Sequence, residues 1–219
     1  MNVVQIKEML ELQHQLNAVI NPDWKKAKNS WTRAIWVEAA ELMDHIGWKW
    51  WKAQDTNVAQ AHIELVDIWH FILSQFAETS DDMDVVASEL HHRLFDQGRR
   101  VIFIRNEIHS LNEMNLLDRV EAMASLAASG NDCTAAFAAC CEEMELGWDE
   151  LRRIYVGKNV LNLFRQANGY KRGTYIKDWN GLEDNVHLEQ ILGASPHLSP
   201  AGLFKQLGFA YARVQKEPA

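Results

Sequence analysis

The chain has 219 residues, of which 47% are apolar and 24% are charged, and this composition is close to the average of folded globular proteins. It disfavours a disordered, collagen-like or membrane class. The formal net charge of −8 disfavours binding to the phosphates of polymeric DNA or RNA. An acidic protein can still bind a small polyphosphate when divalent cations lie between the two sets of negative charge.

The N-terminal stretch Met1–Leu16 mixes polar residues with apolar ones, and no apolar run approaches the length that spans a bilayer. It predicts neither an export signal nor a membrane partner. The cysteines form no CxxC pair and are odd in number, which favours reduced, buried thiols and a cytoplasmic location. They are Cys133, Cys140 and Cys141.

The distribution of proline favours helices, because residues 23–195 contain none. Apolar residues recur there at helical spacing, and we find no convincing set of alternating strands. The sequence therefore predicts an all-α, bundle-like fold. The expected helices are Val3–Ile20, Ser30–Trp51, Val58–Glu78, Asp82–Gln97, Ile104–Ser129, Cys133–Glu145 and Asp149–Ala167.

Capping residues and composition define the end of this helical region. Asp149 is suited to an N-cap, and Asn168-Gly169 supplies residues that tolerate the left-handed conformation at which helices commonly stop. After Gly169 the chain is rich in Gly and Asn through Asn185, which predicts an irregular tail packed on the surface. Because no repeat or low-complexity linker divides the chain, we expect one domain over residues 1–219.

Two pairs of acidic residues occupy consecutive predicted helices. Glu38 and Glu41 are three residues apart, so they share a helical face beside an apolar stripe. Glu64 and Asp67 lie in a helix that is apolar over almost its whole circumference, which is typical of burial. An ionised carboxylate in such a place costs several kcal/mol even after relaxation, so it must be neutralised, paired or metal-bound.

If these helices pack antiparallel across their short connection, the four carboxylates converge. Oxygen ligands suit hard divalent ions such as Mg²⁺, which completes its shell with water and substrate phosphates. Such ions neutralise developing charge, orient a phosphate chain and lower the pKa of an attacking water. A single ExxE pair is usually a solvated helix face, but the combination with ExxD in an apolar helix predicts a metal-dependent polyphosphate site.

Glu38-Ala-Ala-Glu41 followed by Glu64-Leu-Val-Asp67 resembles the ExxE…ExxD signature of the all-α NTP pyrophosphatases, which include MazG-type enzymes and dimeric dUTPases. Residues 48–52, 63–71 and 157–171 resemble dimeric dUTPases specifically. The similarity spans nearly the full chain and is weakest over residues 80–143.

This resemblance implies hydrolysis of dUTP to dUMP and pyrophosphate, with dUDP as a second substrate. The reaction would keep uracil out of DNA and supply dUMP. The resemblance further implies a homodimer, Mg²⁺ with Mn²⁺ as a substitute, and the four carboxylates as catalytic and metal-binding residues. It favours attack of water on the β-phosphorus.

Other residues are candidates for contacts with the nucleotide. Lys158, Asn162 and Arg165 share one helical face, with Lys171 just beyond the helix, and we expect this group to bind phosphate. For the base, carboxamides offer the donor and acceptor that the imide edge of uracil requires, and aromatic rings offer a stacking surface. The base-binding candidates are Gln13, Asn17, Trp50 and Phe71, while His14 and His70 are expected to be structural.

Three alternatives remain open. A MazG-like hydrolase of another nucleotide would share the metals but differ in the base pocket, and the Lys158–Lys171 segment argues against it. Asp67-Ile-Trp-His70 resembles half of a di-iron carboxylate ligand pattern, but neither Glu38 nor Glu41 is followed by the histidine that the second half requires. A helical interaction protein would leave the buried carboxylates unexplained.

Overall fold

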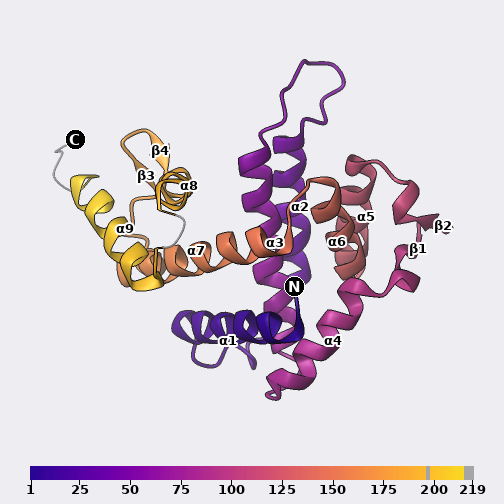
Figure 1. The fold of residues 1–219 in the computed structure, drawn as a ribbon, viewed down its shortest axis with the longest axis horizontal. Helices are drawn as coiled ribbons and strands as arrows, with labels where there is room; N and C mark the ends of the chain where they lie inside the picture. The colour runs from indigo at the N-terminus through magenta and orange to yellow at the C-terminus, as the bar shows by residue number, and fades with distance from the viewer. Residues whose placement is uncertain (196–197, 215–219) are drawn as a thin grey trace.

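A computed structural model of the protein describes residues 1–195 and 198–214, and within these residues helices dominate, which confirms the all-α prediction. Figure 1 shows α2 and α3 as a central pair, with α1, α4, α5 and α6 around one part of it and α7 leading away to the C-terminal elements. The α-helices are α1 (Val3–Ile20), α2 (Trp31–Ile46), α3 (Val58–Ala77), α4 (Met83–Phe95), α5 (Leu116–Ala128), α6 (Thr134–Glu143), α7 (Trp148–Ala167), α8 (Asp184–Ala194) and α9 (Pro200–Val214).

Helices α2 and α3 form an antiparallel hairpin, the condition under which the sequence brings the carboxylates together, and the loop over residues 47–57 extends beyond it (Figure 1). Helix α2 ends at Ile46, five residues before the predicted end at Trp51. Gly47 adopts the left-handed conformation with φ 90°, and its N–H donates to the Met43 carbonyl. This glycine cap ends the helix and leaves the tryptophan-rich segment in the loop.

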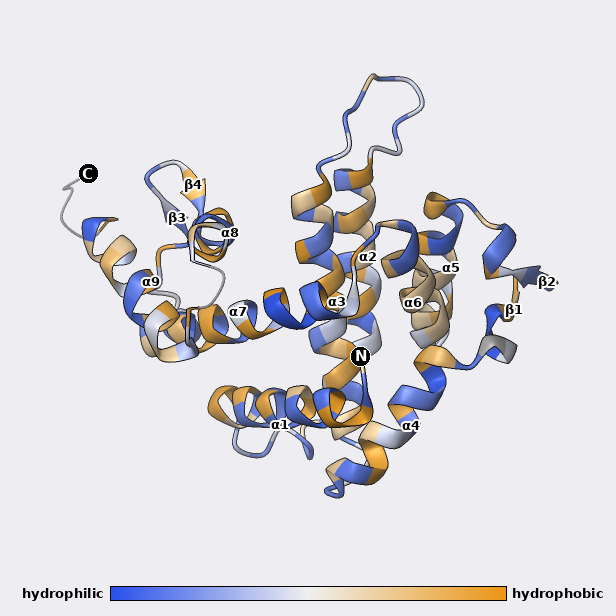
Figure 2. Ribbon diagram, viewed as in Figure 1, coloured by the Kyte–Doolittle hydropathy of each residue, from blue (hydrophilic) through white to orange (hydrophobic). Residues whose placement is uncertain are grey.

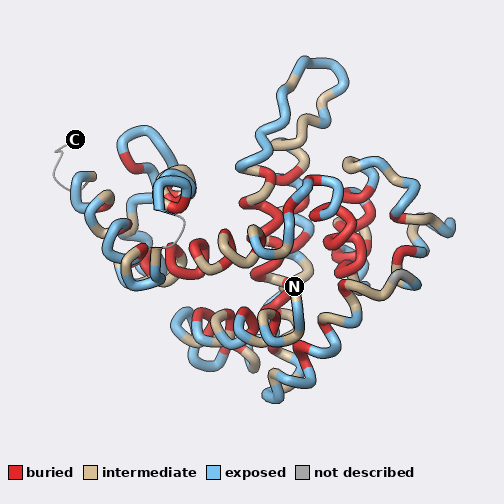
Figure 3. The backbone as a smooth tube through the Cα atoms, viewed as in Figure 1, coloured by how far each residue is buried: buried red, intermediate tan, exposed pale blue. Residues whose placement is uncertain are grey.

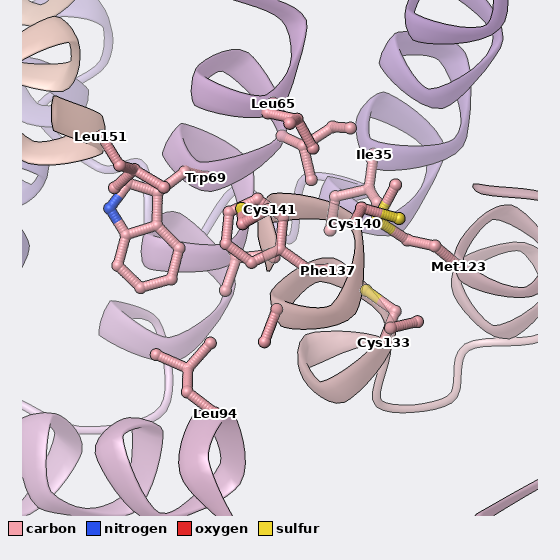
Figure 4. Close-up of a cluster of buried hydrophobic side chains, with 14 of the residues drawn as sticks. Ile35, Leu65, Trp69, Leu94, Met123, Cys133, Phe137, Cys140, Cys141 and Leu151 are labelled. Atoms are coloured by element: carbon pink, nitrogen blue, oxygen red, sulfur yellow. The ribbon is translucent and has the colours of Figure 1, made fainter. Parts of the chain in front are cut away.

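The main hydrophobic core surrounds α3 and α6, which carry many of the buried residues in Figure 3. Trp69 of α3 stacks on Phe137 of α6 with ring centroids 5.4 Å apart (Figure 4). The three cysteines are free and buried in this core, as expected, and burial raises the pKa of Cys133 and Cys140 to about 12. By contrast, α1 carries both hydrophobic and hydrophilic residues along its length (Figure 2), which suits its position at the edge of the core.

Helix α7 connects this core to a second hydrophobic cluster. Its first half supplies Leu151 and Tyr155 to the main core, and its second half supplies Leu161 and Phe164 to a cluster with α8 and α9. The approach of α8 favours a glycine, because a Cβ atom at Gly157 would lie 2.7 Å from a Leu192 methyl carbon, which would have to shift. The two clusters therefore lie side by side along one helix.

The predicted helix Ile104–Ser129 is wrong in its first half. Strands β1 (Val101–Ile104) and β2 (Glu107–Ser110) form an antiparallel hairpin, and α5 begins only at Leu116. Arg105 and Asn106 at the turn have φ 54° and 64°. Two consecutive left-handed residues give the turn that matches the twist of a two-stranded hairpin and cannot continue a helix.

The irregular tail predicted after Gly169 is also wrong, because residues 170–195 and 198–214 contain ordered elements. Strands β3 (Asp178–Trp179) and β4 (Leu182–Glu183) pair across a turn, and α8 and α9 follow. Helix α9 begins at Pro200, which is compatible with the first turn of a helix. Among the described residues, no helix has the length and apolar character needed to cross a membrane.

Candidate active site

Three of the four predicted carboxylates converge between α2 and α3. Each of Glu38, Glu41 and Glu64 offers an oxygen within 4.8 Å of those of the other two. Their helices position them as the ExxE spacing predicts, with Glu41 exposed, Glu38 half-buried and Glu64 buried. His45 lies beside the group, with its Nε2 atom 3.4 Å from Glu64 Oε1.

The charges of this group are poorly compensated by the protein itself. Burial, and then the nearby charge of Asp67, raises the pKa of Glu64 to about 8. The same two causes raise the pKa of Glu38 to about 7. A cluster of carboxylate oxygens, with pKa values raised by burial and then by neighbouring negative charge, has the donor set that hard divalent cations prefer. The residues present therefore fit such a metal.

Asp67, the fourth carboxylate, lies outside the three-oxygen group. Its Oδ2 atom is 2.8 Å from Lys158 Nζ, and this ammonium also donates to Asn185 Oδ1 at 2.9 Å. The Lys158 side chain is only 1% exposed, so the ion pair is shielded from solvent screening. A buried cation thus stands between the acidic group and α8.

Arg165 provides a second cation near Asp67, and the carboxylate of Asp184 holds its guanidinium in position. Its guanidinium donates to both carboxylate oxygens of Asp184, over 2.8 and 2.7 Å, and the Tyr175 hydroxyl donates to the same carboxylate. Burial of Asp184 acts to raise its pKa, but the hydrogen bonds from Arg165 outweigh this and hold the pKa below its usual value. Asp184 is fully buried, so it acts on a ligand only through Arg165.

The four carboxylates, Lys158 and Arg165 line an acidic cavity of about 380 Å³. It contains cations as well as carboxylates, because Lys177 joins Lys158 and Arg165 in the lining. Its carboxylate and cationic lining residues are Glu38, Glu41, Glu64, Asp67, Glu183, Lys158, Arg165 and Lys177.

A second cavity, of about 260 Å³, adjoins the acidic one, because Asp67, Arg165 and Tyr170 line both. Its walls are aromatic: Phe71 and Trp31 lie with ring centroids 6.4 Å apart and an interplanar angle of 27°. We call it the base cavity, because residues that the sequence predicted to bind the base line it. Three predicted base-binding residues line it, namely Gln13, Asn17 and Phe71, together with two predicted phosphate-binding residues, Asn162 and Arg165.

The polar side of the base cavity is a chain of buried hydrogen bonds. His70 Nδ1 lies 2.7 Å from Gln13 Oε1, Gln13 Nε2 donates to Asn17 Oδ1 at 3.0 Å, and Asn17 Nδ2 donates to Ser74 Oγ at 3.0 Å. Burial lowers the pKa of His70 to about 3, so its ring is neutral near pH 7. The histidine contacts one of the predicted base-binding amides, Gln13, directly.

The structure places two predicted site residues elsewhere. The Lys171 ammonium donates to the Ile20 carbonyl at 2.7 Å and lines neither cavity. Trp50 is 90% exposed in the loop after α2 and also lines neither.

Several lining residues were not predicted from the sequence, and the signal available for them differs. Trp31 and His70 were available from the predicted helices, but a single aromatic or histidine in a helix is usually structural. Lys177 and Asn185 fell in the segment that was predicted to be irregular.

No curated protein sequence matches the chain in a direct comparison. A family model described as dUTPase matches residues 5–170, which is most of the chain and includes all four carboxylates. The chain therefore belongs to the dUTPase family, the all-α enzymes that hydrolyse dUTP.

Proposed function

We propose that dUTP binds with its base in the base cavity and its triphosphate in the acidic cavity, and that it is hydrolysed there to dUMP and pyrophosphate. The observation that carries this proposal is the adjacency of the two cavities across Asp67, Arg165 and Tyr170. One cavity offers aromatic walls and carboxamides for a pyrimidine, and the other offers carboxylates and cations for a metal-bound phosphate chain.

Divalent metal ions are general cofactors of dUTPases, and the residues that would hold Mg²⁺ here, or Mn²⁺ in its place, are Glu38, Glu41, Glu64 and Asp67. When bound, such an ion supplies charge neutralisation and a water of lowered pKa. The protein's own contribution is to hold carboxylate oxygens close together at a partly desolvated place. Asp67 would exchange its pairing with Lys158 for this role.

Cations of the protein would balance the part of the phosphate charge that the metal does not, and α7 provides two in the acidic cavity. Lys158 supplies a buried point charge, and Arg165 supplies a planar fork that is oriented by Asp184. Asn162 accepts a hydrogen bond from Arg165 Nη1 at 2.9 Å, so it also orients the fork. The phosphate role of Lys171 requires its ammonium to leave the Ile20 carbonyl.

The first test measures pyrophosphate release with dUTP, dCTP, dTTP, dATP and dGTP, each with Mg²⁺ and with excess chelator. The expected result is Mg²⁺-dependent release with a strong preference for dUTP, and phosphate release from dUDP. A preference for another nucleotide would favour the MazG-like alternative. Turnover that is unaffected by the chelator would contradict the metal assignment.

The second test separates binding from chemistry. A non-hydrolysable dUTP analogue should bind much more tightly with Mg²⁺ than without it, because the acidic cavity repels a triphosphate until cations intervene. Titration calorimetry with and without chelator measures this directly. Equal affinities would show that the phosphates do not occupy the acidic cavity.

We also propose that the chain is one domain that forms a homodimer in the cytoplasm. The family resemblance and the aromatic content motivate the dimer, and the free, buried cysteines motivate the reducing compartment. Light scattering at micromolar concentration should give twice the chain mass of 25.2 kDa. A monomer mass would contradict the proposal.

A further inference from the structure

Ser74 of α3 lies at the polar side of the base cavity and is fully buried, although the proposed chemistry assigns it no contact with phosphate or metal. Its hydroxyl carries a single proton, and this proton goes to the backbone carbonyl of His70, one helical turn earlier, over 2.8 Å. Because this proton is used, the Ser74 oxygen can only accept hydrogen bonds from its other neighbours.

This direction fixes the carboxamide of Asn17. Because Ser74 Oγ must accept, the neighbour that faces it at 3.0 Å is the Asn17 amide nitrogen and not the oxygen. The Asn17 oxygen therefore points to the other side of the amide, where Gln13 Nε2 donates to it at 3.0 Å. A reversed Asn17 would set two acceptors against each other at Ser74, which costs free energy in a buried place.

The orientation of Asn17 in turn fixes the orientation of the Gln13 amide. With its nitrogen donating to Asn17, Gln13 turns its oxygen toward His70 Nδ1 at 2.7 Å and toward the Tyr155 hydroxyl at 3.2 Å. The Nδ1–H tautomer of His70 donates to this oxygen, whereas the single proton of Tyr155 goes to the Met9 carbonyl at 2.8 Å, so the direction of the network at Gln13 rests on His70. The network runs in one direction from its fixed end at Ser74.

The direction of these hydrogen bonds determines which donors and acceptors of the two carboxamides remain free to bind a ligand. Asn17 keeps one free N–H and one oxygen lone pair, and Gln13 keeps one free N–H. This set of a donor, an acceptor and a donor complements the imide edge of uracil, which runs acceptor, donor, acceptor. Cytosine has an amino group in place of one carbonyl and no proton on its ring nitrogen. A reversed Asn17 would suit cytosine better.

We infer that Ser74 is a positioning residue for base specificity, which fixes the orientation of the Asn17 and Gln13 amides so that the base cavity selects an imide-edged pyrimidine over an amino-pyrimidine. The inference rests on the proposed placement of the base in this cavity. It does not require Ser74 to touch the substrate, because its effect passes through Asn17.

The experiment compares kcat/KM for dUTP and for dCTP in the full chain. Ser74→Ala frees Asn17 to reverse, so the dUTP-to-dCTP ratio should fall by about tenfold, the effect of one misdirected buried hydrogen bond. The loss should appear in KM for dUTP, with kcat within about twofold of wild type. Ser74→Thr keeps the hydroxyl and should keep the wild-type ratio.

Ser88→Ala is the matched control, because Ser88 makes the same bond to the carbonyl one turn earlier, at 2.9 Å from Asp84 O, on the exposed side of α4. It should leave the ratio unchanged. An unchanged ratio in Ser74→Ala, an equal loss for both substrates, or a fallen ratio in Ser74→Thr would each overturn the inference. Wild-type protein that hydrolyses dCTP as readily as dUTP would instead contradict the base assignment itself.

Discussion

In the acidic cavity several carboxylates of like charge lie close together. In the base cavity, by contrast, donors and acceptors are hydrogen-bonded to one another. In the first, burial and the neighbouring charge of Asp67 raise the pKa of Glu38 and Glu64. In the second, Gln13 and Asn17 are joined in a directed chain of hydrogen bonds. The carboxylates project from α2 and α3 and the two carboxamides from α1, while α3 supplies side chains to both cavities.

This difference separates two ways of preparing a binding site. The acidic cavity is destabilising by itself and gains its stability from the ligand, since anything that binds only the folded state stabilises it. The base cavity is organised before the ligand arrives, so little is lost in ordering it. We expect mutations in the two cavities to differ accordingly.

The largest expected effect is on turnover in the acidic cavity. Replacing Glu38, Glu41 or Glu64 by Gln, or Asp67 by Asn, keeps the shape but removes charge, so dUTP turnover should fall by about 10²–10³-fold or more while the helical fold persists. Rates of dUTP hydrolysis and circular dichroism measure both.

Without metal, the same amide variants should be as stable as the wild type or more stable, because repulsion among the carboxylates falls. Glu121→Gln, an exposed carboxylate paired with Arg105 on the surface, is the control and should be fully active. Near-normal turnover in two or more folded amide variants would overturn the metal assignment.

The next effect concerns stability at the junction of the cavities. Asp184→Asn removes the buried counter-charge of Arg165 and should lower the free energy of unfolding by about 1.5–3 kcal/mol, which urea denaturation measures. Its neighbour Glu183 pairs with Lys177 at 3.0 Å on the surface, so Glu183→Gln should cost less than about 1 kcal/mol. An equal loss of unfolding free energy in the two variants would show that Asp184 does not hold the Arg165 guanidinium in position.

A smaller effect is expected in the pH dependence of the metal-free protein. The pKa of Glu64 is about 8 and that of Glu38 about 7, both above the usual 4.5, so the folded state binds more protons than the unfolded state between these values. This stabilisation is fully present below about pH 4.5 and is lost as the pH rises through 7 to 8.

The thermal midpoint measured in chelator should therefore fall between pH 5 and pH 9, by about 2–4 °C for each kcal/mol lost. Glu64→Gln should flatten this fall, and added Mg²⁺ should reverse it at high pH. A midpoint that rises over this range in the wild type would contradict the assigned repulsion.

The sequence predicted well wherever burial and helical period acted together. Glu64 lies in a helix that is apolar on all sides, so its position in the core and near Glu38 followed from the pattern and from a short connection. The end of α7 before Asn168-Gly169 followed from local capping chemistry, whereas the predicted N-cap at Asp149 is wrong, because Gly147 caps α7 and Asp149 lies in its first turn. These features are decided within a few residues of the chain.

Features that depend on distant contacts were not predicted. Asp184 pairs with Arg165 across 19 positions, and nothing near Asp184 marks it as a buried acid. The turn Asn180-Gly181, with φ 56° and 84°, is typical of a hairpin. The strands on either side of it are only two residues long, which is too short to give an alternating pattern in the sequence. The direction of the Ser74 network required atomic positions.

The smallest effects should distinguish the aromatic walls of the base cavity from the exposed loop. Base stacking on an aromatic side chain contributes about 1–3 kcal/mol, so Trp31→Leu should raise KM for dUTP about tenfold or more. Trp50 is 90% exposed and lines neither cavity, so Trp50→Leu should change KM less than about twofold. Binding of inorganic triphosphate with Mg²⁺ should be unchanged in both variants, because this ligand has no base. A rise in KM for Trp50→Leu as large as that for Trp31→Leu would instead support the stacking role that the sequence predicted for Trp50, and would mean that the loop over residues 47–57 moves onto the bound base.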